Sequence, residues 1–135
     1  MKKKFLMLLT VILLAFPITK VYASYNQKAN NVQPCMTDSG TRFGGIVLTI
    51  NFNIDEGNYV SVSNMSYFFN AYLSNANCLF TDETKTSGSS TYAKAGVSYI
   101  SSWGDNLDAG YLAIESDEYG NTSNTNIVTY RGKKS

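Results

Sequence analysis

Residues 45–54 read GIVLTINFNI, in which every second side chain from Ile46 to Ile54 is large and apolar. Successive side chains of a β-strand point to opposite faces of its sheet, so this alternation predicts a strand with one buried face. A helix would need apolar residues three and four positions apart. The chain must therefore place a second layer of structure over one face of this strand.

Similar short runs recur along the chain and are separated by turn-forming residues. DEGN at 55–58, SNAN at 74–77 and DEYGN at 117–121 are typical turns, whereas 81–90 and 104–109 are predicted to be polar loops. Further strands are expected at 59–63, 91–101, 110–116 and 127–130. This spacing predicts an all-β fold, a small antiparallel β-sandwich or barrel of about six to seven strands. Residues 45–131 would form one β domain, followed by a short basic tail at 132–135.

Residues 65–73 read MSYFFNAYL and fit two patterns. As a helix, the run places Met65, Phe68, Phe69 and Tyr72 on one stripe; as a strand, it has aromatic rings on both faces. Tyrosine and phenylalanine are strand formers, so propensity favours the strand. The choice between strand and helix stays open at this point.

The N-terminus has the layout of a secretory signal peptide, with three lysines, an apolar run from Phe5 to Phe16, Pro17 and a small residue at Ala23. The run is too short for a permanent transmembrane helix, so cleavage after residue 23 is expected, leaving no integral membrane segment. Loss of four lysines would leave seven basic against ten acidic residues, a net charge of about −3. Nucleic acid is therefore not an expected partner.

Two cysteines, Cys35 and Cys78, remain in the expected exported chain. Paired cysteines usually close in an oxidising compartment, so one disulfide is predicted. Residues 24–44 show no apolar period and contain Pro34, which predicts an irregular N-terminal arm tied down by Cys35. Such an arm would cover one face of the aromatic segment 65–73.

Histidine is absent from the sequence, which excludes Ser-His-Asp and Cys-His nucleophilic sites and histidine-ligated metals. No phosphate-binding or dinucleotide-binding glycine motif occurs, and no cofactor is predicted. Paired carboxylates can still hydrolyse a glycosidic bond, and Glu115 with Asp117 is the pair best placed for it. A strand end that runs into an acidic turn explains the same two residues, so we expect no enzyme.

Trp103 stands beside a predicted Asp/Asn-rich loop and is the best candidate for contact with a ligand. An aromatic face beside carboxylates and amides can stack on a sugar ring and bond its hydroxyls. The alternative is that Trp103 caps the core, and that the Asp and Asn residues form turns rather than hold calcium. The candidate ligand-binding residues are Trp103, Asp105, Asp108, Tyr111 and Tyr119.

The sequence thus predicts a secreted bacterial β-protein without enzymatic activity, which binds an extracellular protein, a glycan or an envelope surface. It would be free outside the cell, or periplasmic in a host with two membranes. A secreted antagonistic peptide or toxin of similar size and export signal is the alternative. A carboxylate-dependent glycan hydrolase is a more remote one.

Overall fold

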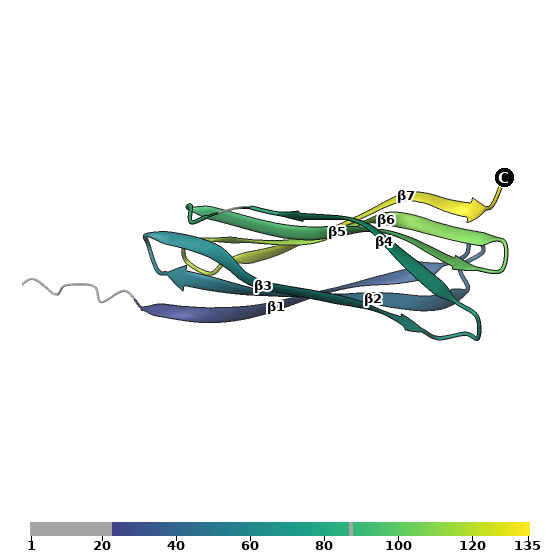
Figure 1. Ribbon diagram of the computed structural model, residues 1–135, viewed down its shortest axis with the longest axis horizontal. Helices are drawn as coiled ribbons and strands as arrows, with labels where there is room; N and C mark the ends of the chain where they lie inside the picture. The colour runs from purple at the N-terminus through teal and green to yellow at the C-terminus, as the bar shows by residue number, and fades with distance from the viewer. Residues whose placement is uncertain (1–22, 87) are drawn as a thin grey trace, which may run out of the picture.

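A computed structural model describes residues 23–86 and 88–135. All of the predicted signal peptide, residues 1–23, except Ala23 lies outside this range. The described chain folds into seven long strands joined by short turns (Figure 1). The strands are β1 (Ser24–Met36), β2 (Arg42–Asp55), β3 (Tyr59–Ala71), β4 (Asn77–Lys85), β5 (Tyr92–Trp103), β6 (Asn106–Asp117) and β7 (Thr122–Lys133). No helix among these residues is long and apolar enough to cross a bilayer.

The strands form two antiparallel sheets that lie face to face, so the predicted all-β sandwich is confirmed. One sheet has the order β1-β2-β3 and the other the order β4-β5-β6-β7, and Figure 1 shows them as two layers. Within each sheet, strands pair only with their neighbours in the sequence, and the chain changes sheet once, between β3 and β4. One isolated bridge joins Val60 at the start of β3 to Ser90 in the connection between β4 and β5. The open question about residues 65–73 is resolved, because 65–71 belong to strand β3.

The core lies between the two sheets and is built from the alternating positions of the central strands. The predicted inward face of β2 is correct, since Ile46, Leu48, Ile50 and Phe52 are all fully buried. β5 contributes the small side chains Ala93, Ala95 and Val97, with Tyr99 further along the same face. Leu112 and Ile114 of β6 complete the apolar filling.

The predicted irregular arm at 24–44 is wrong, because Ser24–Met36 is a regular strand that pairs with β2 along its length. The pattern misled because the buried positions of this edge strand include Asn31 and Gln33 in place of apolar residues. The arm therefore does not cover segment 65–73, since β2 lies between β1 and β3. The basic tail also differs from its prediction, because β7 continues to Lys133.

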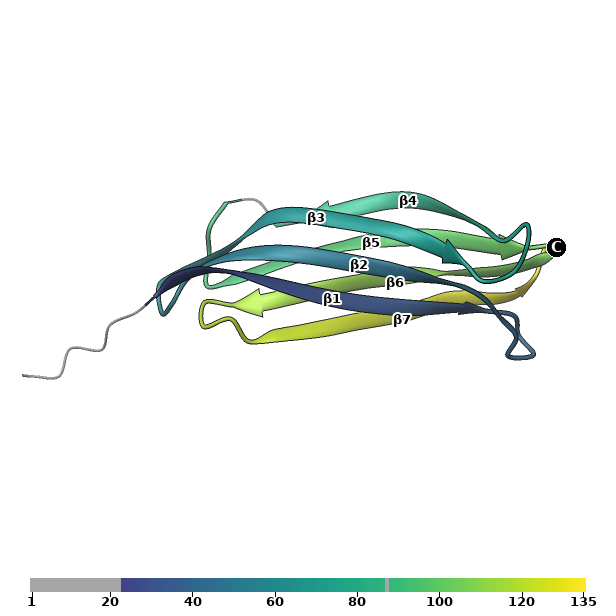
Figure 2. The same ribbon diagram turned by 90° about the horizontal axis from the view of Figure 1, so that it is seen from below.

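Figure 2 shows β1 lying beside β7 along one side of the sandwich. Amide side chains close this side. Asn31 Nδ2 donates to the backbone oxygens of Ala113 (3.0 Å) and Thr125 (3.2 Å). From β7, Asn124 donates to Asn30 O (3.3 Å), and Asn126 donates to the side chain of Gln33 (2.8 Å). This seam protects two strand edges without a backbone ladder between them.

Replacement of Asn31 by alanine tests the seam. We expect the free energy of unfolding to fall by about 1–3 kcal/mol, because two backbone oxygens lose their donor. Asn53→Ala is the matched control: Asn53 is an exposed asparagine on β2, and its loss should cost less than about 0.5 kcal/mol. Urea unfolding of the two variants compares them directly. Equal stabilities would mean that the amide bonds do not hold the seam.

Two predicted polar loops are in fact strand. β4 continues to Lys85, into the segment 81–90, and β6 begins at Asn106, inside the segment 104–109. The polar side chains of 81–85 are exposed on an edge strand, which needs no apolar alternation. Only Gly104 and Asp105 remain as the turn between β5 and β6.

The predicted disulfide is not formed in the structure, where Cys35 and Cys78 are free thiols. Cys35 lies on β1 and Cys78 on β4, and both are at the same end of the core. Burial raises the pKa of Cys35 to about 11, although a hydrogen bond with Ser101 lowers it. Burial also raises the pKa of Cys78 to about 12, with a further increase from the neighbouring Cys35.

These pKa values predict that both thiols react slowly in the folded, reduced protein, because only a thiolate is a good nucleophile. At pH 8 we expect alkylation by iodoacetamide to be at least about 100-fold slower than in urea, as measured by mass spectrometry. Fast alkylation of the folded protein would contradict the buried arrangement. If the protein, denatured without a reducing agent, had no thiol that iodoacetamide could alkylate, the two cysteines would form the disulfide that the structure lacks.

Candidate functional site

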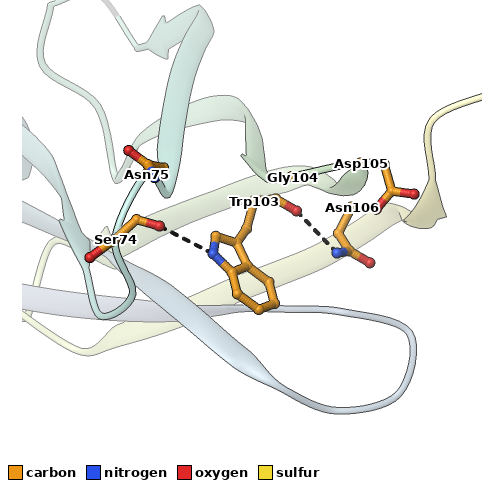
Figure 3. Close-up of a pocket in the computed structure, with 6 residues that line it drawn as sticks. All are labelled: Ser74, Asn75, Trp103, Gly104, Asp105 and Asn106. Atoms are coloured by element: carbon orange, nitrogen blue, oxygen red, sulfur yellow. Dashed lines mark hydrogen bonds between the residues drawn. The ribbon is translucent and has the colours of Figure 1, made fainter.

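A pocket of about 390 Å³ opens at the end of the sandwich where the turn after β3 approaches the turn between β5 and β6 (Figure 3). It is lined by Ser74, Asn75, Trp103, Gly104, Asp105 and Asn106. Two turns build it, and both use a left-handed backbone conformation, at Asn75 (φ 66°) and Gly104 (φ 60°). The pocket therefore combines the only tryptophan of the chain with amides and a carboxylate.

The indole ring of Trp103 is fixed from two directions. Its Nε1 donates a hydrogen bond to the backbone oxygen of Ser74 (3.2 Å), as Figure 3 shows. The ring also lies nearly parallel to Phe43, at 22° and with 6.4 Å between the ring centroids. Trp103 is half-buried, so it packs on the core as the alternative predicted and also lines the pocket. Such a fixed ring loses little entropy when it stacks on a ligand.

The polar side of the pocket comes from the turn and the first residue of β6. Asp105 is mostly exposed and pairs with Lys133 across 3.3 Å. Asn106 is buried, and its Nδ2 donates to Trp103 O (3.0 Å). Its Oδ1 is buried without a hydrogen-bond partner among the described residues. A buried oxygen without a hydrogen-bond partner favours the binding of a ligand group that can donate a hydrogen bond to it.

Asp108, a candidate ligand-binding residue from the sequence, is not among the residues that line the pocket. It is fully buried behind the site on β6, where Oδ2 accepts hydrogen bonds from Met36 N (2.7 Å) and Arg131 Nη2 (3.0 Å). This ion pair joins β1, β6 and β7 inside the sandwich. Asp108 is therefore structural, and Arg131 is tied into the fold by it.

Tyr111 and Tyr119 also lie away from the pocket. Tyr111 is on the outer face of the four-stranded sheet, with Lys94 Nζ 5.7 Å from its ring centroid and Thr84 Oγ1 3.2 Å from its hydroxyl. Tyr119 is in the turn at the opposite end, where its backbone oxygen accepts from Tyr25 (3.1 Å). Of the five candidate residues, the structure thus brings only Trp103 and Asp105 together.

The carboxylates of Glu115 and Asp117 have the wrong electrostatics for hydrolysis. Hydrogen bonds from Ser123 and Tyr92 lower the pKa of Glu115. Burial would raise the pKa of Asp117, but hydrogen bonds from Asn121, Tyr119 and Gly120 lower it overall. A glycoside hydrolase needs one carboxyl kept protonated by a raised pKa, and neither residue provides it.

Four residues that line the pocket were not among the candidates from the sequence: Ser74, Asn75, Gly104 and Asn106. SNAN at 74–77 gave a turn signal, but nothing in the sequence places that turn beside Trp103. Within residues 23–86 and 88–135, no group of three or more Cys, Asp or Glu residues is arranged to hold a metal ion. The two acids of the predicted loop diverge, with Asp105 exposed and Asp108 buried in its ion pair.

The fold and site define a small two-sheet β-sandwich with an aromatic pocket between two turns at one end. Comparison of the chain with known protein families, with curated proteins and with solved structures found no significant match. The proposed function therefore rests on the geometry of the fold and of the pocket.

Proposed function

We propose that this protein is an exported, non-enzymatic binding module that holds a carbohydrate in the Trp103 pocket. The observation that carries the proposal is the fixed indole ring beside a carboxylate and amides in one open pocket. Sugar rings present apolar C–H faces that stack on aromatic rings, and hydroxyls that bond to carboxylates and amides. The volume, about 390 Å³, suits one or two sugar units.

Export is the part of the proposal that rests on the sequence. Lys2, Lys3 and Lys4 precede an apolar run that is typical of a cleaved signal. In a bacterium with two membranes the protein would be periplasmic, and otherwise it would be free outside the cell. Cell fractionation with an antibody to the protein tests this, and a cytoplasmic pool of full-length chain would contradict it.

A glycan array tests the binding function. We expect the wild-type protein to retain a small set of neutral or amino sugars, and Trp103→Ala to lose at least about tenfold in affinity, because stacking on the indole is removed. Tyr119→Ala is the matched control, since it removes an exposed aromatic ring at the other end of the sandwich. Equal loss in both variants, or no binding by wild type, would contradict the proposal.

A further inference from the structure

One sheet of the sandwich has one strand fewer than the other, so one side of the sandwich is incomplete. The three-stranded sheet lies over a four-stranded one: β3 faces β5, whereas β1 faces β6 and lies beside β7. β4 therefore extends past the edge of β3, as Figure 2 shows. We call this feature the step. The free edge of β3 forms its side, and the inward face of β4 forms its base.

Side chains at this step are more exposed than the residues with which they pair on the neighbouring strand. On β4, Cys78 and Phe80 are half-buried, although the residues paired with them on β5, Ser101 and Tyr99, are almost completely buried. On β3, the half-buried side chains are Met65, Tyr67 and Phe69, which pair with the fully buried Ile50, Leu48 and Ile46. The step thus exposes the inward face of the core.

The outer backbone edge of β3 is paired at its start, where Val60 bridges to Ser90, but it is unpaired from Met65 to Phe69. Tyr72 N donates to Phe43 O (2.9 Å), which makes Ala71 and Gly44 a non-hydrogen-bonded pair. Antiparallel ladders alternate, so the N–H and C=O groups of Phe69, Tyr67 and Met65 point away from β2. Among the described residues, no hydrogen bond from another element reaches these groups.

The other three sheet edges have protection that β3 lacks beyond its bridge at Val60. β1 and β7 share the amide seam. β4 carries a register irregularity after Phe80 and the charges of Asp82, Glu83 and Lys85. β3 has no charged residue, no proline and no register irregularity after Asn64. Natural proteins usually block such edges, so an unblocked one indicates a pairing site.

We propose that an extended strand of a partner protein pairs with β3 and fills the step, completing a fourth strand of that sheet. Alternate side chains of this strand would be apolar, because they would cover Tyr67 and Phe80, which pack with 4.6 Å between ring centroids. Glu83 pairs with the buried Val97 and therefore lies on the inward face of β4, where its Oε2 accepts from Tyr67 (2.6 Å). A lysine or arginine at that end of the strand would complement this carboxylate.

A second copy of β3 does not fit the step. A twofold axis between two β3 strands would extend the three-stranded sheet evenly. However, the position beside β3 lies over β4, and that is where β5 of the second copy would have to lie. This arrangement argues against β3 of a second copy, and the proposal commits to a single strand from a different polypeptide.

Hydrogen exchange by NMR tests the proposal on the purified protein. The probe is a synthetic peptide of alternating valine and threonine with two lysines at one end. In the free protein we expect the amides of Met65, Tyr67 and Phe69 to exchange fast, and those of Ser66 and Phe68 to be protected by the ladder to β2. Millimolar peptide should slow exchange at the first three at least tenfold.

A peptide of the same sequence, N-methylated at alternate residues, is the matched control because it cannot complete the ladder. Protection by the unmodified peptide alone supports the proposal. It is overturned if neither peptide protects these amides, if both protect them equally, or if they are already protected in the free protein. If exchange of these amides slowed as the protein concentration rose, without any peptide, a second copy would occupy the step, and the proposal of a partner strand would be overturned.

Discussion

Asp108→Ala should lower the free energy of unfolding by about 3–5 kcal/mol. The carboxylate is fully buried, and its removal leaves Met36 N and the guanidinium of Arg131 without their acceptor. The Arg131 side chain is mostly buried, with 26% exposed, and a charge left unpaired there costs more than the pair contributes, because its desolvation is no longer offset. Urea unfolding measures the loss as a shift of the transition midpoint.

The exposed pair of Asp105 with Lys133 provides the control for this prediction. Lys133→Ala removes a salt bridge of similar length, 3.3 Å against 3.0 Å, but at a site where both side chains are mostly exposed. Solvent screens that pair, so the expected change is below about 1 kcal/mol. If Asp108→Ala cost no more than Lys133→Ala, Asp108 could not be the buried ion-pair residue described here.

Gly110→Ala is the second substitution with a large expected effect. A Cβ at Gly110 would overlap the backbone oxygen of Ile127 and come within 2.8 Å of the Tyr99 hydroxyl. Gly110 lies at the register irregularity between β6 and β7, and the neighbouring atom is backbone, so no side chain can rotate to make room. We expect a loss of about 3 kcal/mol, at the upper end of the range for overpacking.

Gly132→Ala is the matched control on the adjacent strand. Its Cβ would meet only the side chain of Tyr130, with the hydroxyl oxygen at 3.1 Å, and Tyr130 is an exposed side chain that can move. A change within about 1 kcal/mol is expected. Comparable losses at the two glycines, measured by thermal unfolding, would mean that the close contact between β6 and β7 is not as the structure has it.

The sequence predicted those parts of the fold that depend on apolar alternation. The inward faces of β2 and β5 were correct because the buried side chains there are apolar and alternate strictly. β1 was missed because its inward residues Asn31 and Gln33 find hydrogen-bond partners on β6 and β7, more than 80 residues away. A local pattern cannot reveal a partner at that distance.

The candidate site was predicted in part for the same reason. Trp103 and Asp105 are close in the sequence and close in space, and both line the pocket. Asp108 looked like another loop acid, but β6 begins two residues earlier and turns its side chain into the core toward Arg131. Ser74 and Asn75 reach the pocket only because the turn after β3 folds against the other sheet.

The central claim is that the Trp103 pocket binds a carbohydrate, and the single tryptophan of the chain makes it directly measurable. Oligosaccharides retained on the array would be titrated into the protein while the fluorescence of Trp103 is recorded. We predict a saturable change in intensity and wavelength, whose midpoint agrees with the dissociation constant from calorimetry and which shifts at least about tenfold in Asn106→Ala. Calorimetric binding without any change in Trp103 fluorescence would contradict the claim.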